Sequence, residues 1–390
     1  MLLIRNAELY APEAMGICDI LAEGPEIIKV TPAGEISPAL IKEAGVPLQL
    51  IDAKGALTMP GILDQHIHIN GAGGEGGPIN RTPPVRLSSL IEGGITSVVG
   101  LLGTDGICRS IEELLMKARA LEAEGVSTWI HTGSYSLPSV TITESVRRDI
   151  CLIDKVIGVK LALGDHRGSY PTRDELRRTA SDARVAGILS GKAGVVCLHM
   201  GSDADAFSLI TEALAATNIP LSQFLPTHVT RNPKMLEQAA QYARDGGYID
   251  ITAHTADDSS NGVKSAAAIA YLKETGTPLS HVTLSSDGNG SLPRFNAAGE
   301  LESISAAPVN SVLKIIRELI INKSVSIADA VSLATANAAS RLSIKDKGSV
   351  RAGFSCDLLI LDDALSLRYV ISKGKIMMEE GVTVVKGRFE

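Results

Sequence analysis

The stretch GILDQHIHINGAGGEGG, residues 61–77, contains the residues of this sequence with the clearest chemical meaning. His66 and His68 stand two positions apart inside an apolar run that is typical of a β-strand. Side chains at positions i and i+2 of a strand point to the same face, so both imidazoles can bind one metal ion. The two histidines therefore predict a metal site at the end of this strand.

The glycines that follow allow a second interpretation, a dinucleotide-binding loop, because Gly71, Gly73 and Gly76 have the spacing G-x-G-x-x-G. Such a loop requires a helix directly after its third glycine. The chain instead continues PINRTPPVRLSSL, with three prolines before helical material. We therefore reject the dinucleotide interpretation and expect the glycines to fold a loop tightly over the metal site, with Glu75 as its one charged residue.

The elements that must position these residues alternate between strands and helices. Eight short apolar segments are candidates for strands, and their starts are separated by roughly 24 to 38 residues, the length of one strand and one helix. They are residues 62–69, 96–103, 127–134, 156–163, 194–201, 224–231, 248–255 and 281–288. Helical periodicity lies between them, as in residues 111–125 and 232–247. The pattern predicts an α/β fold, a (β/α)8 TIM-like barrel.

Active sites of such barrels lie at the carboxy-terminal ends of the strands. The residues there that can bind or bridge a metal are His66 and His68 on the first strand, Lys160 on the fourth, His199 on the fifth, His228 on the sixth and Asp287 on the eighth. Because five strand ends carry such residues, we expect a metal centre. A single histidine is more often a hydrogen-bonded core residue. We interpret the other histidines in this way: His131, His166, His254 and His281.

Both ends of the chain differ from its middle. Residues 1–59 and residues 346–390 read as short alternating strands separated by Gly, Pro and Asp turns. We expect these two segments to meet in one small β-sandwich beside a barrel of residues 60–345.

Composition and charge favour an enzyme that acts on small molecules. Hydrophobic residues make up 45% of the 390 residues and charged residues 21%, which suits a globular chain with a large core. The net charge of −7, without a cluster of Lys and Arg, argues against a nucleic-acid surface. No apolar run reaches the ~18 residues of a membrane span, and the apolar start of the chain is too short for a signal peptide. With five scattered cysteines that fit reduced thiols, we expect a soluble cytoplasmic protein.

Several motifs together resemble the amidohydrolase superfamily. They are HIHI on the first strand, GVK on the fourth, the single histidines of the fifth and sixth, and SSDGNG on the eighth. The glycine-rich loop and the segments GLLGTD, TGSY, GDHR and PTHVTRN resemble, more narrowly, the branch that hydrolyses isoaspartyl (β-aspartyl) dipeptides. The resemblance extends over nearly the whole chain. It implies a zinc-dependent peptidase that forms a large homo-oligomer, with an octamer as the candidate size.

The resemblance implies a metal-binding role for the strand-end residues. His66 and His68 would bind the more buried of two zinc ions, and His199 and His228 the more exposed one. Lys160, carboxylated by carbon dioxide, would bridge the two ions, because a carbamate is an anionic oxygen ligand and an ammonium is not.

The resemblance also implies catalytic and substrate-binding roles. Asp287 would contact the more buried zinc and carry the proton of the metal-bridging hydroxide, and Tyr135 would donate a hydrogen bond to the developing oxyanion. A β-aspartyl dipeptide has one ammonium and two carboxylates, which one acidic residue and two arginines would match. The substrate contacts would come from Glu75, Arg167, Arg231, Ser291 and the backbone of Gly73 and Thr104.

Two further interpretations stay open. A cyclic amidase or an N-acyl-amino-acid deacylase of the same superfamily would use the same metal centre, although the two arginines and Glu75 favour a doubly carboxylated, zwitterionic substrate. A non-catalytic scaffold relative would have lost some ligands, whereas all six candidates are present.

Overall fold

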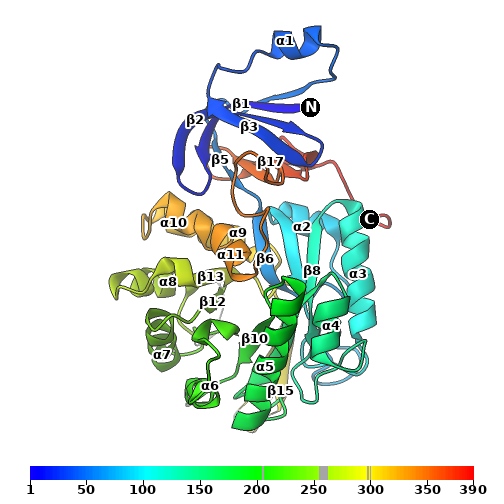
Figure 1. The fold of residues 1–390 in the computed structure, drawn as a ribbon, viewed down its shortest axis with the longest axis vertical. Coiled ribbons are helices and arrows are strands. Elements are labelled where there is room, and N and C mark those ends of the chain that lie inside the picture. The colour runs from blue at the N-terminus through cyan, green and yellow to red at the C-terminus, as the bar shows by residue number, and fades with distance from the viewer. Residues whose placement is uncertain (204–205, 254–261, 297, 299) are drawn as a thin grey trace.

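The computed structural model describes residues 1–390 apart from 204–205, 254–261, 297 and 299. Its two parts are a barrel, in the lower half of Figure 1, and a small sheet domain above it. A search of the described residues finds no helix with the length and apolar character needed to cross a membrane.

Eight parallel strands form the barrel and follow one another around it in sequence order. They are β6 (Ile62–Ile67), β7 (Ile95–Gly100), β8 (Ser127–Gly133), β9 (Val156–Leu163), β10 (Val195–Met200), β11 (Phe224–Thr227), β12 (Ile249–Thr252) and β13 (Val282–Ser285). Each strand falls inside or overlaps one of the eight predicted segments, so the predicted TIM-like barrel is confirmed. The last strand approaches the first through a bridge between Ile67 and Gly288.

Helices connect the barrel strands and also follow the last of them, β13. They are α2 (Leu87–Glu92), α3 (Ile111–Glu124), α4 (Val146–Leu152), α5 (Arg173–Ser190), α6 (Ala206–Leu214), α7 (Pro233–Arg244), α8 (Ser265–Glu274), α9 (Ser311–Ile321), α10 (Ile327–Ser332) and α11 (Ala336–Arg341), with short 3-10 turns η1 (Leu221–Gln223) and η2 (Leu279–His281). Local sequence sets their limits. The longest, α5, starts with a capping box between Thr172 and Glu175 and ends at Gly191, whose φ of +68° suits glycine.

Both ends of the chain contribute to the small domain, as predicted. Its strands are β1 (Leu2–Tyr10), β2 (Ala14–Glu23), β3 (Glu26–Pro32), β4 (Gln49–Asp52), β5 (Leu57–Pro60), β16 (Leu358–Leu361), β17 (Leu367–Ser372), β18 (Lys375–Glu379) and β19 (Val382–Thr383), with the short helix α1 (Pro38–Glu43). They form one mixed sheet of nine strands. The two ends join at β5, which pairs parallel to β1 and antiparallel to β16.

The small domain has a hydrophobic core of its own. Side chains from both ends of the chain, including Leu3, Ile20 and Ile360, are fully buried. The core cluster that contains Ile20 and Ile360 is separate from the large cluster between the barrel and its helices. Because neither terminal segment has a core alone, the sheet depends on both.

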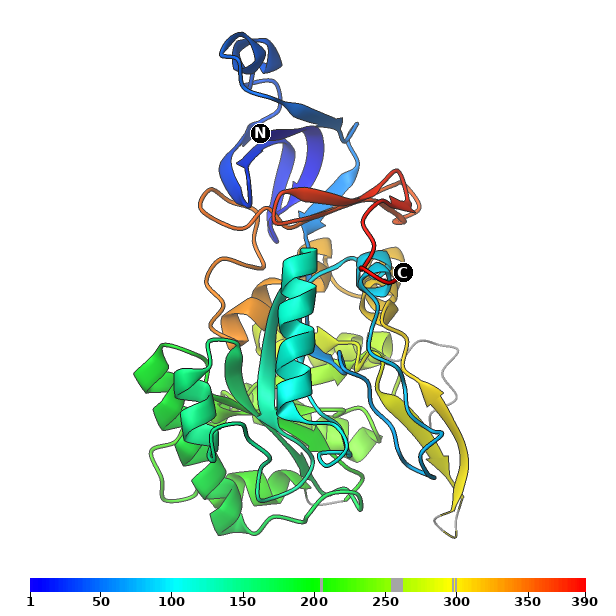
Figure 2. The ribbon, with the colours of Figure 1, turned by 90° about the vertical axis from the view of Figure 1, so that its right-hand side faces the viewer.

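A two-stranded antiparallel ribbon, β14 (Ser291–Phe295) and β15 (Leu301–Ala306), follows the last barrel strand. The sequence pattern did not predict it. In Figure 2 the ribbon, in yellow, runs beside the blue loop that follows β6. The two segments are in contact, because a Cβ added to Gly76 would lie 2.2 Å from a methyl carbon of Leu301.

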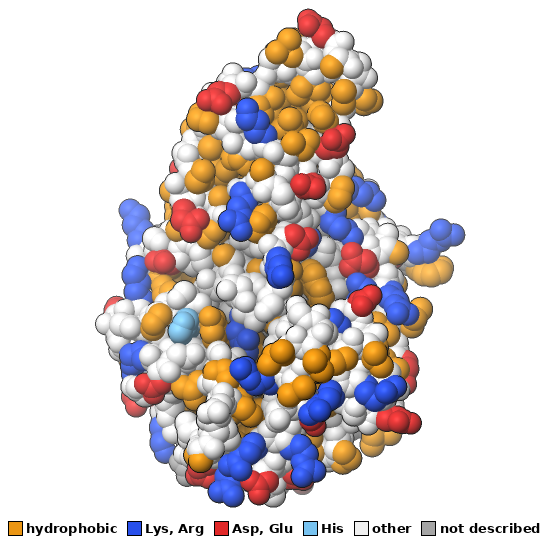
Figure 3. All heavy atoms as spheres, viewed as in Figure 1, with side chains coloured by type: hydrophobic (Ala, Val, Ile, Leu, Met, Phe, Trp, Pro, Cys, Tyr) orange, Lys and Arg blue, Asp and Glu red, His pale blue; other side chains and the backbone are white. Residues whose placement is uncertain are grey.

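The face drawn in Figure 3 carries lysine and arginine side chains interspersed with aspartate and glutamate. This face therefore has no broad basic area of the kind that phosphate backbones require, in agreement with the net charge.

Candidate active site

The ends of five barrel strands carry the six predicted metal-binding residues to one region. Lys160 and His199 lie inside β9 and β10, while His68, His228 and Asp287 lie just beyond the ends of β6, β11 and β13. His66, His68, His199 and His228 are each at most 5% exposed and Lys160 is 0% exposed. The barrel thus brings together all six residues, although they do not all touch.

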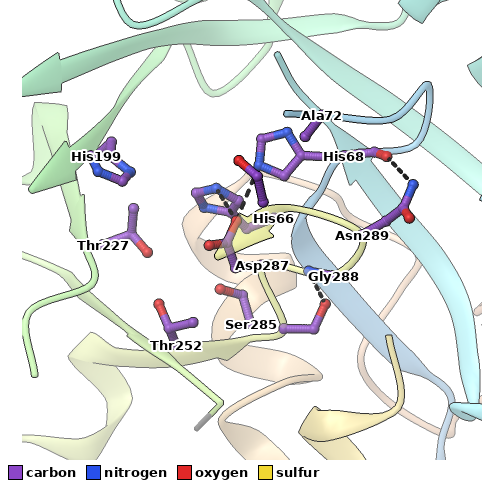
Figure 4. Close-up of polar contacts among 12 residues, drawn as sticks. His66, His68, Ala72, His199, Thr227, Thr252, Ser285, Asp287, Gly288 and Asn289 are labelled. Atoms are coloured by element: carbon purple, nitrogen blue, oxygen red, sulfur yellow. Dashed lines mark hydrogen bonds and ion pairs between the residues drawn. The ribbon is translucent and has the colours of Figure 1, made fainter. Parts of the chain in front are cut away.

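His66, His68 and Asp287 form the most compact group. Oδ1 of Asp287 lies 3.1 Å from Nε2 of His68 and 3.3 Å from Nε2 of His66. Figure 4 shows both rings directed at this carboxylate. One ligand atom from each of the three residues lies within 4.8 Å of the others, so they could hold one metal ion.

Closure of the barrel places Asp287 beside the two histidines. The backbone N–H of His68 donates to the carbonyl of Gly288 at 3.0 Å. His66 and Ser286 stand two residues before His68 and Gly288, and the buried carboxylate of Asp64 accepts hydrogen bonds from both of their backbone N–H groups at 3.1 Å. These bonds join the end of β6 to the segment after β13, where Asp287 has a left-handed φ of +53°.

Lys160 is buried beside the first histidine. Its Nζ lies 3.1 Å from Nε2 of His66 and 3.9 Å from Sγ of Cys197. Burial lowers the pKa of the Lys160 amine, because the interior disfavours the charged form. Among the described residues, no carboxylate lies within ion-pair distance of this nitrogen, so the amine has no counter-charge in contact.

His199 and His228 lie across the barrel mouth, with ring centroids 4.4 Å apart. Nδ1 of His228 lies 2.6 Å from the hydroxyl of Thr252, and within the described part of the chain its Nε2 has no hydrogen-bond partner. His199 differs, because Nδ1 contacts the Tyr135 hydroxyl at 2.6 Å and Nε2 contacts Asp165 at 3.0 Å. Binding of a metal by His199 would therefore replace one of these contacts.

The donor set fits a metal centre. Among the described residues, Nδ1 of His66, Nδ1 of His68 and Nε2 of His228 find no hydrogen-bond partner although they are buried, which is costly for a polar atom. Burial, followed by the charge of Lys160, holds the pKa of His66 well below its usual value, and burial does the same for His228. Neutral imidazoles have the lone pair that a metal ligand needs.

The loop after β6 places Glu75 among polar residues that the sequence analysis assigned to substrate binding. Its carboxylate accepts hydrogen bonds from Thr104 at 3.0 Å, from Arg167 at 3.2 Å and from Ser291 at 3.2 Å. Gly73 has a φ of +92°, and a Cβ there would lie 2.2 Å from the carbonyl oxygen of Asn80. The glycine is therefore required for the fold of this loop. The next helix, α2, starts only at Leu87, in agreement with rejection of the dinucleotide interpretation.

The two arginines also lie near the histidines. Nη2 of Arg231 lies 3.0 Å from Nε2 of His199, and its Nε donates to the carbonyl of Met200 at 2.6 Å. Arg167 forms a two-point salt bridge with Asp165, with distances of 2.8 and 3.0 Å, in addition to its contact with Glu75. A cavity of about 730 Å³ opens between these side chains, the metal-binding histidines and the β14–β15 ribbon.

Asp165 is the site residue that sequence reasoning missed. Burial alone would raise its pKa, but hydrogen bonds from His199 and Arg167 hold the pKa far below the usual range of a carboxyl. Asp165 follows the end of β9, so the strand-end rule that selected Lys160 could have found it. From the segment GDHR, only Arg167 was predicted as a site residue.

The four histidines interpreted as core residues have different surroundings. His131 is fully buried, and Nδ1 of His281 donates to the carbonyl of Ala243 at 3.1 Å. His166 is exposed and lines the cavity, so its core interpretation was wrong: it stands in the loop beyond β9. His254 lies outside the described residues.

A sequence model described as the amidohydrolase family matches residues 57–377, which span the barrel and include β5, β16, β17 and part of β18 of the small sheet. This chain belongs to the amidohydrolase family. Two crystal structures of β-aspartyl dipeptidase from Fervidobacterium islandicum AW-1 are 39% and 38% identical to it, with TM-scores of 0.90 and 0.87. In both comparisons 98% of each chain is covered, and one of the two crystal structures contains β-Asp-Leu dipeptide.

Other similar proteins are more distant. D-hydantoinase from Thermus sp. is 17% identical with a TM-score of 0.70 over 99% of this chain and 97% of its own, a likeness of fold alone. Dihydroorotases from Streptococcus pyogenes and Staphylococcus aureus are 28% and 32% identical over 116 and 112 residues, which is 29% of this chain. The chain matches only about a quarter of the length of these curated relatives, 25% and 24%.

Proposed function

We propose that this amidohydrolase is a dinuclear zinc peptidase that hydrolyses the β-aspartyl isopeptide bond of dipeptides. The observation that carries the proposal is the shared cavity: the candidate ligands His68, His199, His228 and Asp287 line it together with Arg167 and Arg231, and Arg167 contacts the carboxylate of Glu75. The similarity to β-aspartyl dipeptidase, at 39% identity over 98% of both chains, supports the same substrate class.

In this proposal His66 and His68 hold one zinc ion, His199 and His228 hold the second, and carboxylated Lys160 bridges them. The fully buried amine with a lowered pKa supports the last step, because only a neutral amine adds to carbon dioxide. When bound, the two cations would lower the pKa of a water molecule and polarise the scissile carbonyl.

Asp287 is the proposed proton carrier. Burial alone would raise its pKa, but the hydrogen bond from His68 holds the pKa well below the usual range. The carboxylate is therefore ionised at neutral pH and can accept the proton of the attacking water. Its Oδ1 contacts His66 and His68, whereas its Oδ2 lies 4.0 Å from the imidazole of His228. Oδ2 is therefore the atom that accepts the proton and returns it to the leaving amine.

Tyr135 is the proposed hydrogen-bond donor to the oxyanion. Burial raises the pKa of its hydroxyl above the usual value, so the group keeps its proton at every physiological pH. The hydroxyl lies 2.6 Å from Nδ1 of His199 and therefore beside the proposed second metal. A buried neutral O–H in this position can stabilise charge on the carbonyl oxygen.

Substrate recognition exchanges ion pairs inside the protein for ion pairs with the dipeptide. Glu75 and Arg167 contact each other at 3.2 Å, and both side chains are largely buried. A substrate ammonium would take the place of the guanidinium beside Glu75, and a substrate carboxylate would take the place of Glu75 beside Arg167. A ligand with only a carboxylate would leave Glu75 without a cationic partner, and a ligand with only an ammonium would leave Arg167 paired with Asp165 alone. A zwitterionic dipeptide satisfies both.

The proposal extends to a zinc-dependent, cytoplasmic homo-oligomer whose substrate is a small dipeptide, with an octamer as the candidate size. Support for a reducing compartment comes from the cysteines, all five of which are free. The domain limits of 1–59, 60–345 and 346–390 belong to the same proposal.

A cyclic amidase is the second candidate, because hydantoinase has the same fold and dihydroorotases match part of the sequence. Purified enzyme should be tested with β-Asp-Leu, α-Asp-Leu, dihydroorotate, hydantoin and N-acetyl-leucine at equal concentrations. We expect turnover of β-Asp-Leu to exceed that of all others. Preferred turnover of a ring or of the acetylated amino acid would contradict the proposal, and absence of any hydrolysis would favour a scaffold relative.

A further inference from the structure

A further buried carboxylate lies within β12, between two strands that carry candidate ligands, and is not part of the proposed chemistry. Asp250 of β12 is 1% exposed and accepts four side-chain hydrogen bonds. Oδ1 accepts from Gln65 at 2.7 Å and from Thr283 at 2.8 Å. Oδ2 accepts from Thr227 at 2.7 Å and from Ser285 at 2.6 Å. The donors come from β6, β11 and β13, so one carboxylate joins four neighbouring barrel strands.

Three of the four donors stand next to candidate metal ligands in the sequence. Gln65 precedes His66, Thr227 precedes His228, and Ser285 lies two residues before Asp287. Figure 4 places Thr227 and Ser285 at the barrel strands beside the group formed by His66 and Asp287. Each hydrogen bond to Asp250 therefore fixes the backbone immediately before a ligand, at the point where the chain leaves the strand.

The backbone after these donors has unusual conformations that need such support. His228 and Asp287 have left-handed φ values of +63° and +53°, and the β6–β7 register shifts between Asp64 and Ile67. For residues other than glycine, such conformations persist only where the surroundings impose them. A fully buried carboxylate with four donors in short hydrogen bonds is rigid, because the loss of any one leaves buried polar atoms unpaired.

We propose that Asp250 is a positioning residue that sets the distance between the strand ends carrying His66, His228 and Asp287, and so sets the affinity of the site for its metals. The inference rests on the proposed metal centre and deepens it. Asp250 touches neither substrate nor metal. It acts through Gln65, Thr227 and Ser285.

The alternative is that Asp250 only stabilises the barrel, as buried hydrogen-bonded carboxylates do elsewhere in this chain. Asp149 offers a matched comparison. It is fully buried and accepts from the hydroxyl of Thr132 at 2.6 Å, which resembles the bond from Thr227 to Asp250. The Thr132 bond joins β8 to α4, away from the strand ends that carry the histidines. Thr132→Val therefore controls for the loss of a buried hydroxyl.

The test measures zinc affinity directly, by competition with a chromophoric chelator, for the wild type, Asp250→Asn, Thr227→Val, Ser285→Ala and Thr132→Val. We expect the first three variants to bind zinc about 10- to 100-fold more weakly, the usual effect of removing a group that orients metal ligands. Thr132→Val should bind zinc as the wild type does. The visible spectrum of the cobalt-substituted protein should shift in Thr227→Val and stay unchanged in Thr132→Val.

Unchanged zinc affinity and an unchanged cobalt spectrum in Thr227→Val and Ser285→Ala would overturn the inference, and so would equal weakening in Thr132→Val. The two single-donor variants decide the question if Asp250→Asn does not fold. The proposed function fails separately, because it requires that the wild type bind zinc and hydrolyse β-Asp-Leu. A wild type that does both, with variants that bind zinc equally well, contradicts only the role of Asp250.

Discussion

At the scale of single residues, burial determines which protonation state each group has. Lys160 is fully buried beside His66, and its lowered pKa makes the amine available for carboxylation. His66 and His228 are held neutral by burial, as metal ligands must be. The sequence predicted these residues because each stands at a strand end, where the type and position of a side chain are sufficient to identify a candidate metal ligand. Asp165 was not predicted although it follows a strand end, and Asp250 was not predicted because its role depends on hydrogen bonds from other strands.

Lys160→Ala should bind less zinc than the wild type and lose most of its activity on β-Asp-Leu, because the bridging ligand is missing. Zinc content can be measured by elemental analysis after gel filtration. Acetate or propionate should restore part of the activity to the alanine variant, since a small carboxylate can occupy the space of the carbamate. Full zinc content together with full activity in Lys160→Ala would contradict the bridging role.

Glu75→Gln should bind zinc normally but reduce kcat/KM for β-Asp-Leu by at least ~10-fold, equivalent to about 1.4 kcal/mol. The lost contact is charge-assisted, and Arg167 loses its partner at 3.2 Å as well. N-acetylation of the substrate removes the same ammonium. Acetylation should therefore impair the wild type severely and the variant much less, and equal sensitivity of the two enzymes would show that Glu75 does not bind the amine.

At the scale of elements, the strand order of the barrel was predictable and the loops above it were not. Eight strand segments recur at regular spacing, so β6 to β13 could be located from the sequence. The β14–β15 ribbon lies in a stretch with no clear alternation, and its pairing depends on the packing of Leu301 against the loop at Gly76. The contact of Glu75 with Arg167 joins two loops whose residues are 92 positions apart in the sequence, so no local sequence pattern could predict it.

Two glycines of the loop after β6, Gly73 and Gly77, allow a test of whether lack of space for a side chain is what requires glycine. Gly73→Ala should displace the loop and raise KM for β-Asp-Leu while zinc content stays normal, because the new Cβ would lie 2.2 Å from the Asn80 carbonyl. Gly77 is the matched control. Its φ of +112° is similarly positive, but a Cβ there meets nothing within 4 Å. Steady-state kinetics should show a smaller rise in KM for Gly77→Ala, and an equal rise would indicate backbone strain as the common cause.

At the scale of the whole molecule, the small sheet is tied to the base of the barrel by an ion-pair cluster. Glu122 of α3 contacts Lys373, in the turn between β17 and β18, at 2.7 Å and Lys155 at 3.0 Å. Burial alone would raise the pKa of Glu122, but hydrogen bonds from Lys373 and Lys155 lower it to about 2. The sequence predicted that the two chain ends meet, yet it contained no signal for this contact with α3.

Glu122→Gln should lower the melting temperature at neutral pH and make it less sensitive to acid. A carboxyl whose pKa falls from about 4.5 to about 2 on folding stabilises the folded state above pH 4.5 and loses that contribution as the pH falls towards 2. The melting temperatures of the wild type and the variant should therefore become equal near pH 2. Glu237→Gln, at an exposed position of α7, is the control and should follow the wild type at every pH.

The measurement that tests the central claim most directly is a zinc titration of the chelator-stripped protein, with β-Asp-Leu hydrolysis recorded at each step. The dinuclear peptidase requires that stripped protein be inactive and that activity rise with added zinc to a plateau at two ions per chain. Full β-Asp-Leu hydrolysis by the stripped protein, or none at any zinc concentration, would contradict it.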